Sequence, residues 1–292
     1  MKSIVVIICL LVLGVFAQAK QTKYGVNIPE NYQDEIDVVY KEVGGWQGRM
    51  DVYFDKDKEK PTPLVINIHG GGWNHGEKES QKGYGSFFKK GFAVANVEYR
   101  LVDVAPAPAA IEDVRCALLY MIANAKKYNI DTDRIVIMGG SAGGHLALVA
   151  GLLQNNHVFD KDCLPVEPVK IAAIIDKYGV ADLTGAPKGT WKYKSVRNWL
   201  GDRQNSMKFA ASVSPIAYVN SLSPPVFIVH GDADPIVPYS QSVTLHEKLV
   251  EAGVPTEFIT IKGGQHGKFS KEDKSMLSRA IINFLVKQKI ID

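Results

Sequence analysis

Hydrophobic residues along this chain gather in short apolar runs, which are separated by longer segments of mixed polarity. Two segments near the start, 34–43 and 49–54, roughly alternate between polar and apolar residues, as half-buried strands do. The glycine-rich segment 44–48 lies between them and predicts a hairpin connection. The opening of the fold is therefore expected to be antiparallel.

Beyond residue 63, short apolar runs alternate with segments that have a helical pattern. The runs predict buried strands, and the segments between them predict helices. The predicted strands are 64–68, 92–97, 134–138, 170–175, 225–229 and 257–261, and the predicted helices are about 80–90, 109–128, 146–153, 239–252 and 270–287. This alternation is typical of a mostly parallel sheet with helices on both faces, so the predicted fold class is α/β.

The segment 180–224 is a long departure from this alternation, because it contains Trp191 and Trp199 but few clean periods. A stretch of this length inside a compact domain is usually a functional insertion over a site, and the alternative is an ordinary pair of peripheral helices. The sequence supports the two interpretations equally. Since no repeat, low-complexity tract or linker divides the chain, we expect residues 20–292 to form a single domain, with 180–224 as its cap insertion.

The first residues have the character of a signal peptide, which would occupy residues 1–19. Lys2 supplies a positive charge, residues 4–17 form an uncharged and mostly apolar run, and a small-x-small cleavage sequence ends at Ala19. The apolar run is short for a transmembrane helix, although an uncleaved membrane anchor is the alternative. We expect cleavage after Ala19 and a secreted or periplasmic protein that is not held at a membrane.

The composition suits a globular protein with a sizeable core, since 46% of the residues are hydrophobic and 22% are charged. The net charge of +3 is small for 292 residues and gives no reason to expect a nucleic acid or an anionic membrane as a partner. Two cysteines remain after signal cleavage, Cys116 and Cys163. They can pair in an oxidising compartment or stay as free thiols, and the sequence leaves both outcomes open.

Candidate chemistry is concentrated at residues 139–143, where a predicted strand runs into the sequence Gly-Gly-Ser-Ala-Gly and then into a predicted helix. A serine in this context is typical of a sharp turn that exposes a nucleophilic hydroxyl. Glycines are needed on either side because the turn brings the strand and helix backbones close together. The alternative is a glycine-rich turn in which Ser141 only caps the helix.

Two further loops supply the partners that a nucleophilic serine needs. Asp232 and Asp234 follow one predicted strand, and His266 follows the next. In open α/β sheets the ligand crevice lies beyond the carboxyl ends of the strands, so these side chains are expected to meet Ser141 there. The chain order serine, acid, histidine accompanies this kind of turn and predicts a catalytic triad.

Four motifs together resemble those of the α/β-hydrolase superfamily, and within it the esterases that carry a histidine-triple-glycine motif. The motifs are HGGGW at 69–73, GGSAGG at 139–144, HGDADPIVP at 230–238 and GGQHG at 263–267. The resemblance covers nearly all of the chain from about Asp34. It implies an α/β-hydrolase fold, with Ser141 as the nucleophile, Asp234 rather than Asp232 as the acid, and His266 as the base.

The triple-glycine loop has a chemical role in this resemblance. Attack on an ester carbonyl builds negative charge on its oxygen, which backbone N–H groups stabilise when they already point at it. The N–H of Ala142 is one expected donor of this oxyanion hole, and the others come from Gly71 and Gly72. His69 is expected to brace the loop by hydrogen bonding.

No cofactor or metal ion is expected. None of the other histidines has convincing metal-ligand spacing. Structural roles are expected for His145 and His230, and loop or surface positions for His75, His157 and His246. The glycines around Ser141 do not have the order of a dinucleotide-binding fingerprint.

The expected function is hydrolysis of carboxylic esters through a serine acyl-enzyme. Within the superfamily, the chain resembles exported bacterial esterases that remove acetyl or feruloyl groups from plant polysaccharides such as xylan. The expected partner is therefore a small ester or an acylated polysaccharide. Trp73 and Tyr178 are candidates for stacking on a sugar or feruloyl ring, as are Trp191 and Trp199, although such residues more often only pack.

Three rival functions stay open. A serine peptidase of the prolyl-oligopeptidase type shares the order of the triad, but such enzymes carry a large amino-terminal domain that has no counterpart here. An arylformamidase shares a related glycine loop, and an export signal argues against it. A catalytically inactive hydrolase fold that serves as a binding module is disfavoured because all three triad residues are present.

Overall fold

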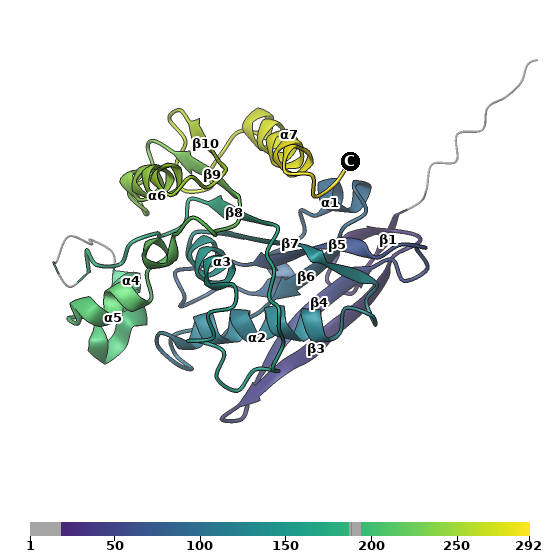
Figure 1. Ribbon diagram of the computed structural model, residues 1–292, viewed down its shortest axis with the longest axis horizontal. Coiled ribbons are helices and arrows are strands. Elements are labelled where there is room, and N and C mark those ends of the chain that lie inside the picture. The colour runs from purple at the N-terminus through teal and green to yellow at the C-terminus, as the bar shows by residue number, and fades with distance from the viewer. Residues whose placement is uncertain (1–18, 187, 189–193) are drawn as a thin grey trace, which may run out of the picture.

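The computed structural model describes residues 19–186, 188 and 194–292 (Figure 1). Nearly all of the predicted signal peptide lies outside these residues, and so does Trp191. Ala19, after which cleavage is predicted, is the first residue that the structure describes.

A mixed sheet of eight strands forms the centre of the fold, in the order β10-β9-β8-β7-β5-β6-β4-β3. Neighbouring strands run parallel from β10 to β6, whereas β4 pairs antiparallel with both β6 and β3. The strands are β3 (Gln33–Val43), β4 (Trp46–Phe54), β5 (Thr62–Ile68), β6 (Ala93–Val97), β7 (Ile130–Gly140), β8 (Ala173–Lys177), β9 (Val226–Gly231) and β10 (Thr256–Ile261), with a separate antiparallel pair of β1 (Ala19–Gln21) and β2 (Asn27–Pro29). The predicted fold class, a mostly parallel α/β sheet with antiparallel N-terminal strands, is confirmed.

Helices cover both faces of this sheet, as Figure 1 shows. Residues of α1 and α7 pack into the core on one face, and residues of α2, α3 and α6 pack into the core on the other. The helices are α1 (Gly85–Lys89), α2 (Ala109–Ala123), α3 (Ala142–Leu153), α4 (Lys194–Leu200), α5 (Met207–Ser212), α6 (Ser240–Glu251) and α7 (Lys271–Lys287), with 3₁₀ turns η1 (Lys78–Ser80), η2 (Gly201–Arg203) and η3 (Pro215–Tyr218). Within the described parts of the chain, none of the helices is both long enough and apolar enough to cross a membrane.

The core on each face follows the two-residue period of the strands. In β5, every residue is buried. Leu64 and Ile66 belong to the cluster beneath α2 and α3, and Val65 belongs to the cluster beneath α1 and α7. A parallel strand that is covered on both faces must be largely apolar on both, which is why the run 64–66 of β5 is apolar without interruption.

The hairpin between β3 and β4 forms where the sequence predicts it, but its connection is shorter. Gly44 and Gly45 both have positive φ, 56° and 82°. Two such residues suffice for a tight turn whose twist matches that of the strands. Strand β4 therefore begins at Trp46, inside the predicted connection 44–48.

Two predicted helices are shorter than their sequence pattern indicates. The helix predicted at 109–128 ends at Ala123, because the chain turns at Asn124, whose side-chain amide donates to the Tyr120 carbonyl at 2.9 Å. The helix predicted at 80–90 is reduced to α1 and a preceding 3₁₀ turn.

The described part of the segment 180–224 is helical and belongs partly to the core. It contains α4, η2, α5 and η3, which lie at the left of the view in Figure 1. Val196, Trp199, Leu200 and Ala210 are buried in the same hydrophobic cluster as α2 and α3. The helices are peripheral to the sheet, but their inner side is packed like the rest of the domain.

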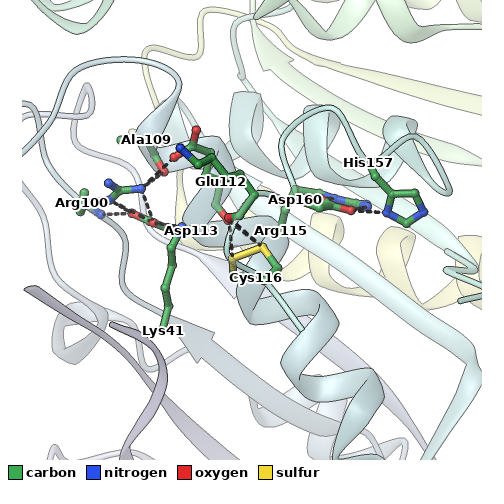
Figure 2. Close-up of a disulfide and its surroundings, with 11 residues drawn as sticks. Lys41, Arg100, Ala109, Glu112, Asp113, Arg115, Cys116, His157 and Asp160 are labelled. Atoms are coloured by element: carbon green, nitrogen blue, oxygen red, sulfur yellow. Dashed lines mark hydrogen bonds and ion pairs between the residues drawn. A yellow bond between two sulfur atoms is a disulfide. The ribbon is translucent and has the colours of Figure 1, made fainter. Parts of the chain in front are cut away.

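A disulfide between Cys116 and Cys163 joins α2 to the loop that follows α3 (Figure 2). The structure thus contains the pair that the sequence leaves open. Beside it, the buried Arg115 forms a two-pronged ion pair with Asp160 of the same loop, with both nitrogen–oxygen distances at 2.6 Å. His157 contacts Asp160 from the solvent side. Covalent and ionic contacts together hold this loop against α2.

Removing the disulfide is expected to destabilise the protein. The two cysteines are 47 residues apart in the chain, and cross-linking an unfolded chain over such a loop is worth about 2–4 kcal/mol. We expect the double variant Cys116→Ala/Cys163→Ala to lose roughly that much free energy of unfolding in urea denaturation followed by circular dichroism. A reductant should destabilise the wild-type protein to a similar extent and leave the double variant unchanged. Equal stability of the two proteins without reductant would contradict this expectation.

Candidate active site

The strand order reverses at β5 and β7, which lie side by side in the sheet. From β5 the chain crosses to β6 on one side, and from β7 it crosses to β8 on the other. The two connections leave the carboxyl ends of these strands in opposite directions, and such a reversal opens a crevice. Residues 69–73 follow β5 and Ser141 follows β7, so two of the predicted motifs meet at this crevice.

Ser141 occupies a strained turn between β7 and α3. Its φ of 58° and ψ of −122° are unusual for a residue with a side chain. A Cβ atom on Gly139 would lie 2.2 Å from the Gly143 carbonyl oxygen, and a Cβ on Gly143 would lie 2.3 Å from the Ile68 carbonyl oxygen. Both glycines are therefore required by the close approach of strand and helix, as the sequence pattern predicts.

The three residues of the predicted triad lie within hydrogen-bonding distance of one another. His266 Nε2 is 2.8 Å from Ser141 Oγ, and His266 Nδ1 is 2.6 Å from Asp234 Oδ2. Because an ionised carboxylate only accepts hydrogen bonds, Nδ1 carries the proton and donates to Asp234, and Nε2 is left to accept the serine proton. The arrangement has the geometry that proton transfer from serine to histidine requires.

Asp234 is held in its charged form by its surroundings. Its side chain is fully buried, and burial by itself would raise the pKa. Hydrogen bonds from His230, His266 and the backbone N–H of Ile236 outweigh the burial and hold the pKa of Asp234 well below its usual range. The acid is therefore a carboxylate at neutral pH, which is the form that stabilises a histidine cation.

His230 is part of this arrangement, although sequence reasoning assigns it only a structural role. Its Nε2 lies 3.2 Å from Asp234 Oδ2 and 3.1 Å from the Val237 carbonyl oxygen, and its Nδ1 lies 2.7 Å from Ser242 Oγ. Since Nε2 faces two acceptors, it carries the proton and donates to them, while the Ser242 hydroxyl donates to Nδ1. His230 thus positions the acid. The feature of the sequence that could have indicated this role is the four-residue spacing from His230 to Asp234 at the end of a strand.

Asp232, the alternative acid, has a different partner. It is exposed, and its Oδ1 accepts a hydrogen bond from the Gly263 N–H at 2.6 Å. This contact ties the loop after β9 to the loop after β10, which carries His266. The side chain that meets His266 is that of Asp234.

Gly71 and Gly72 form a compact loop beside Ser141. Their φ values are 119° and 57°, and a Cβ atom on Gly71 would lie 1.8 Å from the His75 carbonyl oxygen. The loop closes on itself, because the N–H groups of Asn74 and His75 both donate to the Gly71 carbonyl at 3.1 Å. Only glycine fits at this point of the turn.

Gly71, Gly72 and Ala142 line the same cavity as Ser141. Ala142 is the first residue of α3, and the N–H groups of a first helical turn have no acceptor within the helix. The three predicted oxyanion donors thus border one space together with the serine hydroxyl.

His69 lies behind this loop in the position expected of a brace. Its Nδ1 is 2.7 Å from the Gly70 carbonyl oxygen, and its ring stacks on that of Tyr99 with 4.3 Å between centroids. The Tyr99 hydroxyl donates to the His69 carbonyl at 3.1 Å. Burial lowers the pKa of His69 despite the hydrogen bond to Gly70, so the ring is neutral and donates through Nδ1.

The cavity over Ser141 has a volume of about 450 Å³, which lies in the range of small-molecule sites. Its lining includes the triple-glycine loop, Trp73, and Val180, Ser195 and Val196. The last three belong to the segment 180–224. The two interpretations of that segment therefore both hold in part, because its helices are peripheral to the sheet and yet border the candidate site.

Trp73 lines the cavity but has little free surface. It is only 2% exposed and stacks on Trp199, with 4.7 Å between ring centroids. His145 packs edge-on against both indoles and donates from Nε2 to the Val213 carbonyl at 2.8 Å. Burial lowers the pKa of His145 to about 4, so this histidine is neutral and structural, as predicted. The inner indole, Trp199, is a packing residue.

Tyr178, the other predicted substrate-binding residue, does not line the cavity over Ser141. Its φ of 46° breaks the alternation of β8 and turns the side chain to the face of the sheet that carries α7. There its ring packs against the rings of His266 and Phe269, with centroid distances of 4.9 and 5.8 Å. The turn after β8 thus places the Tyr178 ring against His266 and outside the cavity over Ser141, where the sequence prediction had no means to place it.

Asp176 is a buried carboxyl group behind the nucleophile. Its Oδ1 accepts a hydrogen bond from the Gly179 N–H at 3.0 Å, and its Oδ2 is buried without a partner among the residues that the structure describes. A Cβ atom on Gly144 would lie 2.4 Å from Oδ1, so the carboxyl group sits against the start of α3. Burial raises the pKa of Asp176 to about 7, because Gly179 and the charge of Lys177 offset it only in part.

The described residues contain no group of three or more His, Cys, Asp or Glu side chains that could hold a metal ion. In the loop after α3, the two ring nitrogens of His157 are within hydrogen-bonding distance of the Asp160 and Glu167 carboxylates. The ring of His246 contacts the Thr256 hydroxyl. Neither of these histidines lines the cavity over Ser141.

Comparison with known proteins places this site in a family. Residues 50–249 match the BD-FAE family, a span that includes Ser141 and Asp234. The chain belongs to the BD-FAE family. Members of this family are α/β-hydrolase esterases.

Several of the curated proteins to which the chain is similar are esterases by name. Esterase LipQ of Mycobacterium tuberculosis is 29% identical over 255 residues, which cover 83% of this chain and 60% of LipQ. Esterase LipC of the same organism is 27% identical over 239 residues, which cover 75% of this chain and 56% of LipC. This BD-FAE chain thus spans little more than half the length of these relatives.

Solved structures with the same fold include carbohydrate esterases. A truncated carbohydrate esterase from gut microbiota superposes with a TM-score of 0.77 at 27% identity, over 89% of this chain and 98% of that one. An acetyl ester-xyloside bifunctional hydrolase from Caldicellulosiruptor lactoaceticus has a TM-score of 0.75 at 25% identity, over 91% and 99% of the two chains. The BD-FAE fold of this chain is therefore matched over nearly its full described length.

Replacing Asp176 by asparagine is expected to stabilise this BD-FAE protein above neutral pH and to have little effect in acid. The pKa of Asp176 is about 7 in the fold and about 4 in an unfolded chain. Below about pH 4 the carboxyl is neutral in both states. Between about pH 4 and 7 it ionises in the unfolded chain but stays neutral in the fold, so the stability of the wild type falls as the pH rises through this range. The asparagine variant cannot ionise, so it should gain up to about 4 kcal/mol relative to wild type at a pH near 8.

Thermal unfolding of both proteins at several pH values checks this expectation. The exposed Asp232→Asn serves as the matched control and should show no such pH-dependent gain. A stability gain of equal size at pH values near 4 and near 8 would show that the ionisation of Asp176 is not the cause.

Proposed function

We propose that this protein is a serine carboxylic-ester hydrolase that works through an acyl-enzyme. The observation that carries the proposal is the chain of hydrogen bonds from Ser141 through His266 to Asp234, which borders a cavity lined by the triple-glycine loop. Membership in an esterase family supports the same reaction class.

The first half of the reaction forms the acyl-enzyme. Ser141 Oγ attacks the ester carbonyl carbon while its proton passes to His266 Nε2. Asp234 keeps the imidazole in the right tautomer and stabilises the cation that forms. When the tetrahedral intermediate collapses, His266 returns the proton to the departing alcohol oxygen, and the acyl group stays on Ser141.

The second half releases the acid. Water gives a proton to His266 as it attacks the acyl carbon. The resulting intermediate collapses while His266 returns that proton to Ser141 Oγ, which releases the carboxylic acid and regenerates the free serine. In both halves the carbonyl oxygen becomes negatively charged. N–H groups of Gly71, Gly72 and Ala142 stabilise that charge, and each such donor is worth about 3 kcal/mol of barrier.

The proposed substrate is a small acyl ester on a carbohydrate, with an acetyl or feruloyl group on plant polysaccharide as the leading candidate. The carbohydrate esterase and the acetyl ester-xyloside hydrolase among the similar structures support this choice. The cavity also has polar groups suited to sugar hydroxyls, since Asn74, His75 and Ser195 line it beside the triple-glycine loop. A serine peptidase or arylformamidase of the same fold is the alternative function.

We also propose that the protein acts after export. Residues 1–19 have the features of a signal peptide. The disulfide between Cys116 and Cys163 is suited to an oxidising compartment, where such bonds persist. Mass spectrometry of protein recovered from the envelope or the medium tests this proposal, because an intact Met1 would contradict it.

Replacing Ser141 by alanine is expected to reduce kcat for p-nitrophenyl acetate by at least about 10³-fold, because the nucleophile is lost. The circular dichroism spectrum and the melting temperature should remain close to those of the wild type, since the hydroxyl faces a cavity. Undiminished turnover in the folded variant would refute the acyl-enzyme.

The same pair of proteins distinguishes the substrate classes. Acetylated xylan, methyl ferulate and a dipeptide amide are assayed beside p-nitrophenyl acetate. We expect Ser141-dependent hydrolysis of the first two and none of the amide. Preference for the dipeptide amide would favour the peptidase instead.

Two neighbouring acids offer a matched test of the triad. Asp234→Asn removes the acceptor that fixes the His266 tautomer and should lower kcat by about 10⁴-fold. Asp232→Asn removes a charge only two residues away, at an exposed position, and should leave kcat within about twofold. The measurement is kcat for p-nitrophenyl acetate at neutral pH. Equal losses in the two variants would mean that Asp234 has no special role.

A further inference from the structure

A second cavity lies between α1, α7 and the carboxyl ends of β7, β8 and β9. It has a volume of about 370 Å³, at the lower end of the range for small-molecule sites. None of its lining residues also lines the cavity over Ser141. Tyr178 and Gly267 border it beside His266, so the two cavities lie on opposite sides of the catalytic histidine.

The walls of this second cavity are mainly apolar. Met138 and Val229 reach it from the sheet, on the face that carries α1 and α7. Phe87 of α1 and Leu277 and Ile281 of α7 complete the apolar surface. A small ligand with an apolar or aromatic body would pack well against these side chains.

The charged side chains that line the second cavity are all positive. Lys177 and Lys274 line it, and no Asp or Glu is among its lining residues. Lys177 is the last residue of β8, where strand alternation places it on the face of Ala173 and Ile175, opposite to Asp176. Among the residues that the structure describes, neither lysine has an ion pair or a hydrogen-bond acceptor for its ammonium group.

The other polar side chains that line the cavity carry hydroxyl groups, and none of them supplies a negative charge. The Ser86 and Ser278 hydroxyls bond to each other at 2.6 Å across α1 and α7. The half-buried Tyr178 lines the cavity with its ring, and no described residue accepts a hydrogen bond from its hydroxyl. Burial lowers the pKa of Lys177, and the charge of Asp176, on the opposite face of β8, offsets this effect only in part. No carboxylate lines the cavity to act as a counter-charge. The missing partner is an anion.

We infer that this cavity, defined by Lys177, Lys274, Met138, Val229 and Leu277, is a second ligand site that binds a small carboxylate with an apolar or aromatic body. The body packs between α1 and α7, and the carboxylate meets the ammonium of Lys177, with Lys274 as a second cation at the rim. The inference is independent of the proposed ester hydrolysis, because binding can be measured without any ester.

Titration calorimetry of the full chain with 3-phenylpropanoate tests the site, with 3-phenylpropanamide as an uncharged probe of the same shape. We expect the carboxylate to bind at least about tenfold more tightly than the amide. The variant Lys177→Met keeps the apolar stem and removes the charge, and it should weaken carboxylate binding about tenfold or more. Lys271→Met removes an exposed charge from the same helix as Lys274 and should leave binding unchanged.

The location of binding is tested with Ser195→Phe, which fills the cavity over Ser141 and not the second cavity. Binding of 3-phenylpropanoate should survive in this variant. If Lys177→Met fails to fold, Lys177→Gln takes its place. The inference is overturned if the amide binds as tightly as the carboxylate, if inorganic phosphate binds more tightly than either, if Lys177 variants bind normally, or if no binding occurs at millimolar concentration.

Discussion

The site depends on how closely the ends of β5 and β7 approach each other. At Gly143 there is no room for a side chain against the Ile68 carbonyl, and at Gly70 a Cβ atom would lie 2.8 Å from the Gly140 carbonyl oxygen. This contact sets the triple-glycine loop directly beside the turn that carries Ser141. The loops after β9 and β10 then need only reach the same edge of the sheet to add Asp234 and His266. One close backbone contact thus determines where Ser141 and its proposed oxyanion donors lie.

Much of this arrangement could be predicted because it depends on local chemistry. Apolar runs predict strands that are buried on both faces, and the glycines around Ser141 predict a turn too tight for side chains. The order of Ser141, Asp234 and His266, each after a strand, predicts that their side chains meet, since parallel strands end at one edge. The hairpin between β3 and β4 could be predicted equally well, because two successive glycines readily adopt the positive φ values that a tight turn needs.

The remaining features depend on contacts between distant parts of the chain. The sequence suggests Tyr178 as a substrate-binding residue. A positive φ at this one position turns its ring against His266, outside the cavity over Ser141, and no pattern in the sequence reveals that angle. The hydrogen bond from His230 to Asp234 could not be predicted, because it depends on the path that the loop after β9 takes. The pairing of Cys116 with Cys163 required α2 and a loop 47 residues away to lie together. Each of these depends on tertiary geometry rather than on periodicity.

The stacked indoles of Trp73 and Trp199 have a consequence for how substrate reaches Ser141. One ring belongs to the triple-glycine loop and the other to α4, and both are at least 98% buried, since their exposed fractions are 2% and 0%. Swinging α4 away as a hinged cover would bring both rings into water, at a cost of the order of several kcal/mol. The position of α4 against the triple-glycine loop is therefore strongly favoured. Ser195 and Val196 of α4 thus form a wall of the Ser141 cavity that is held in place before any ligand enters.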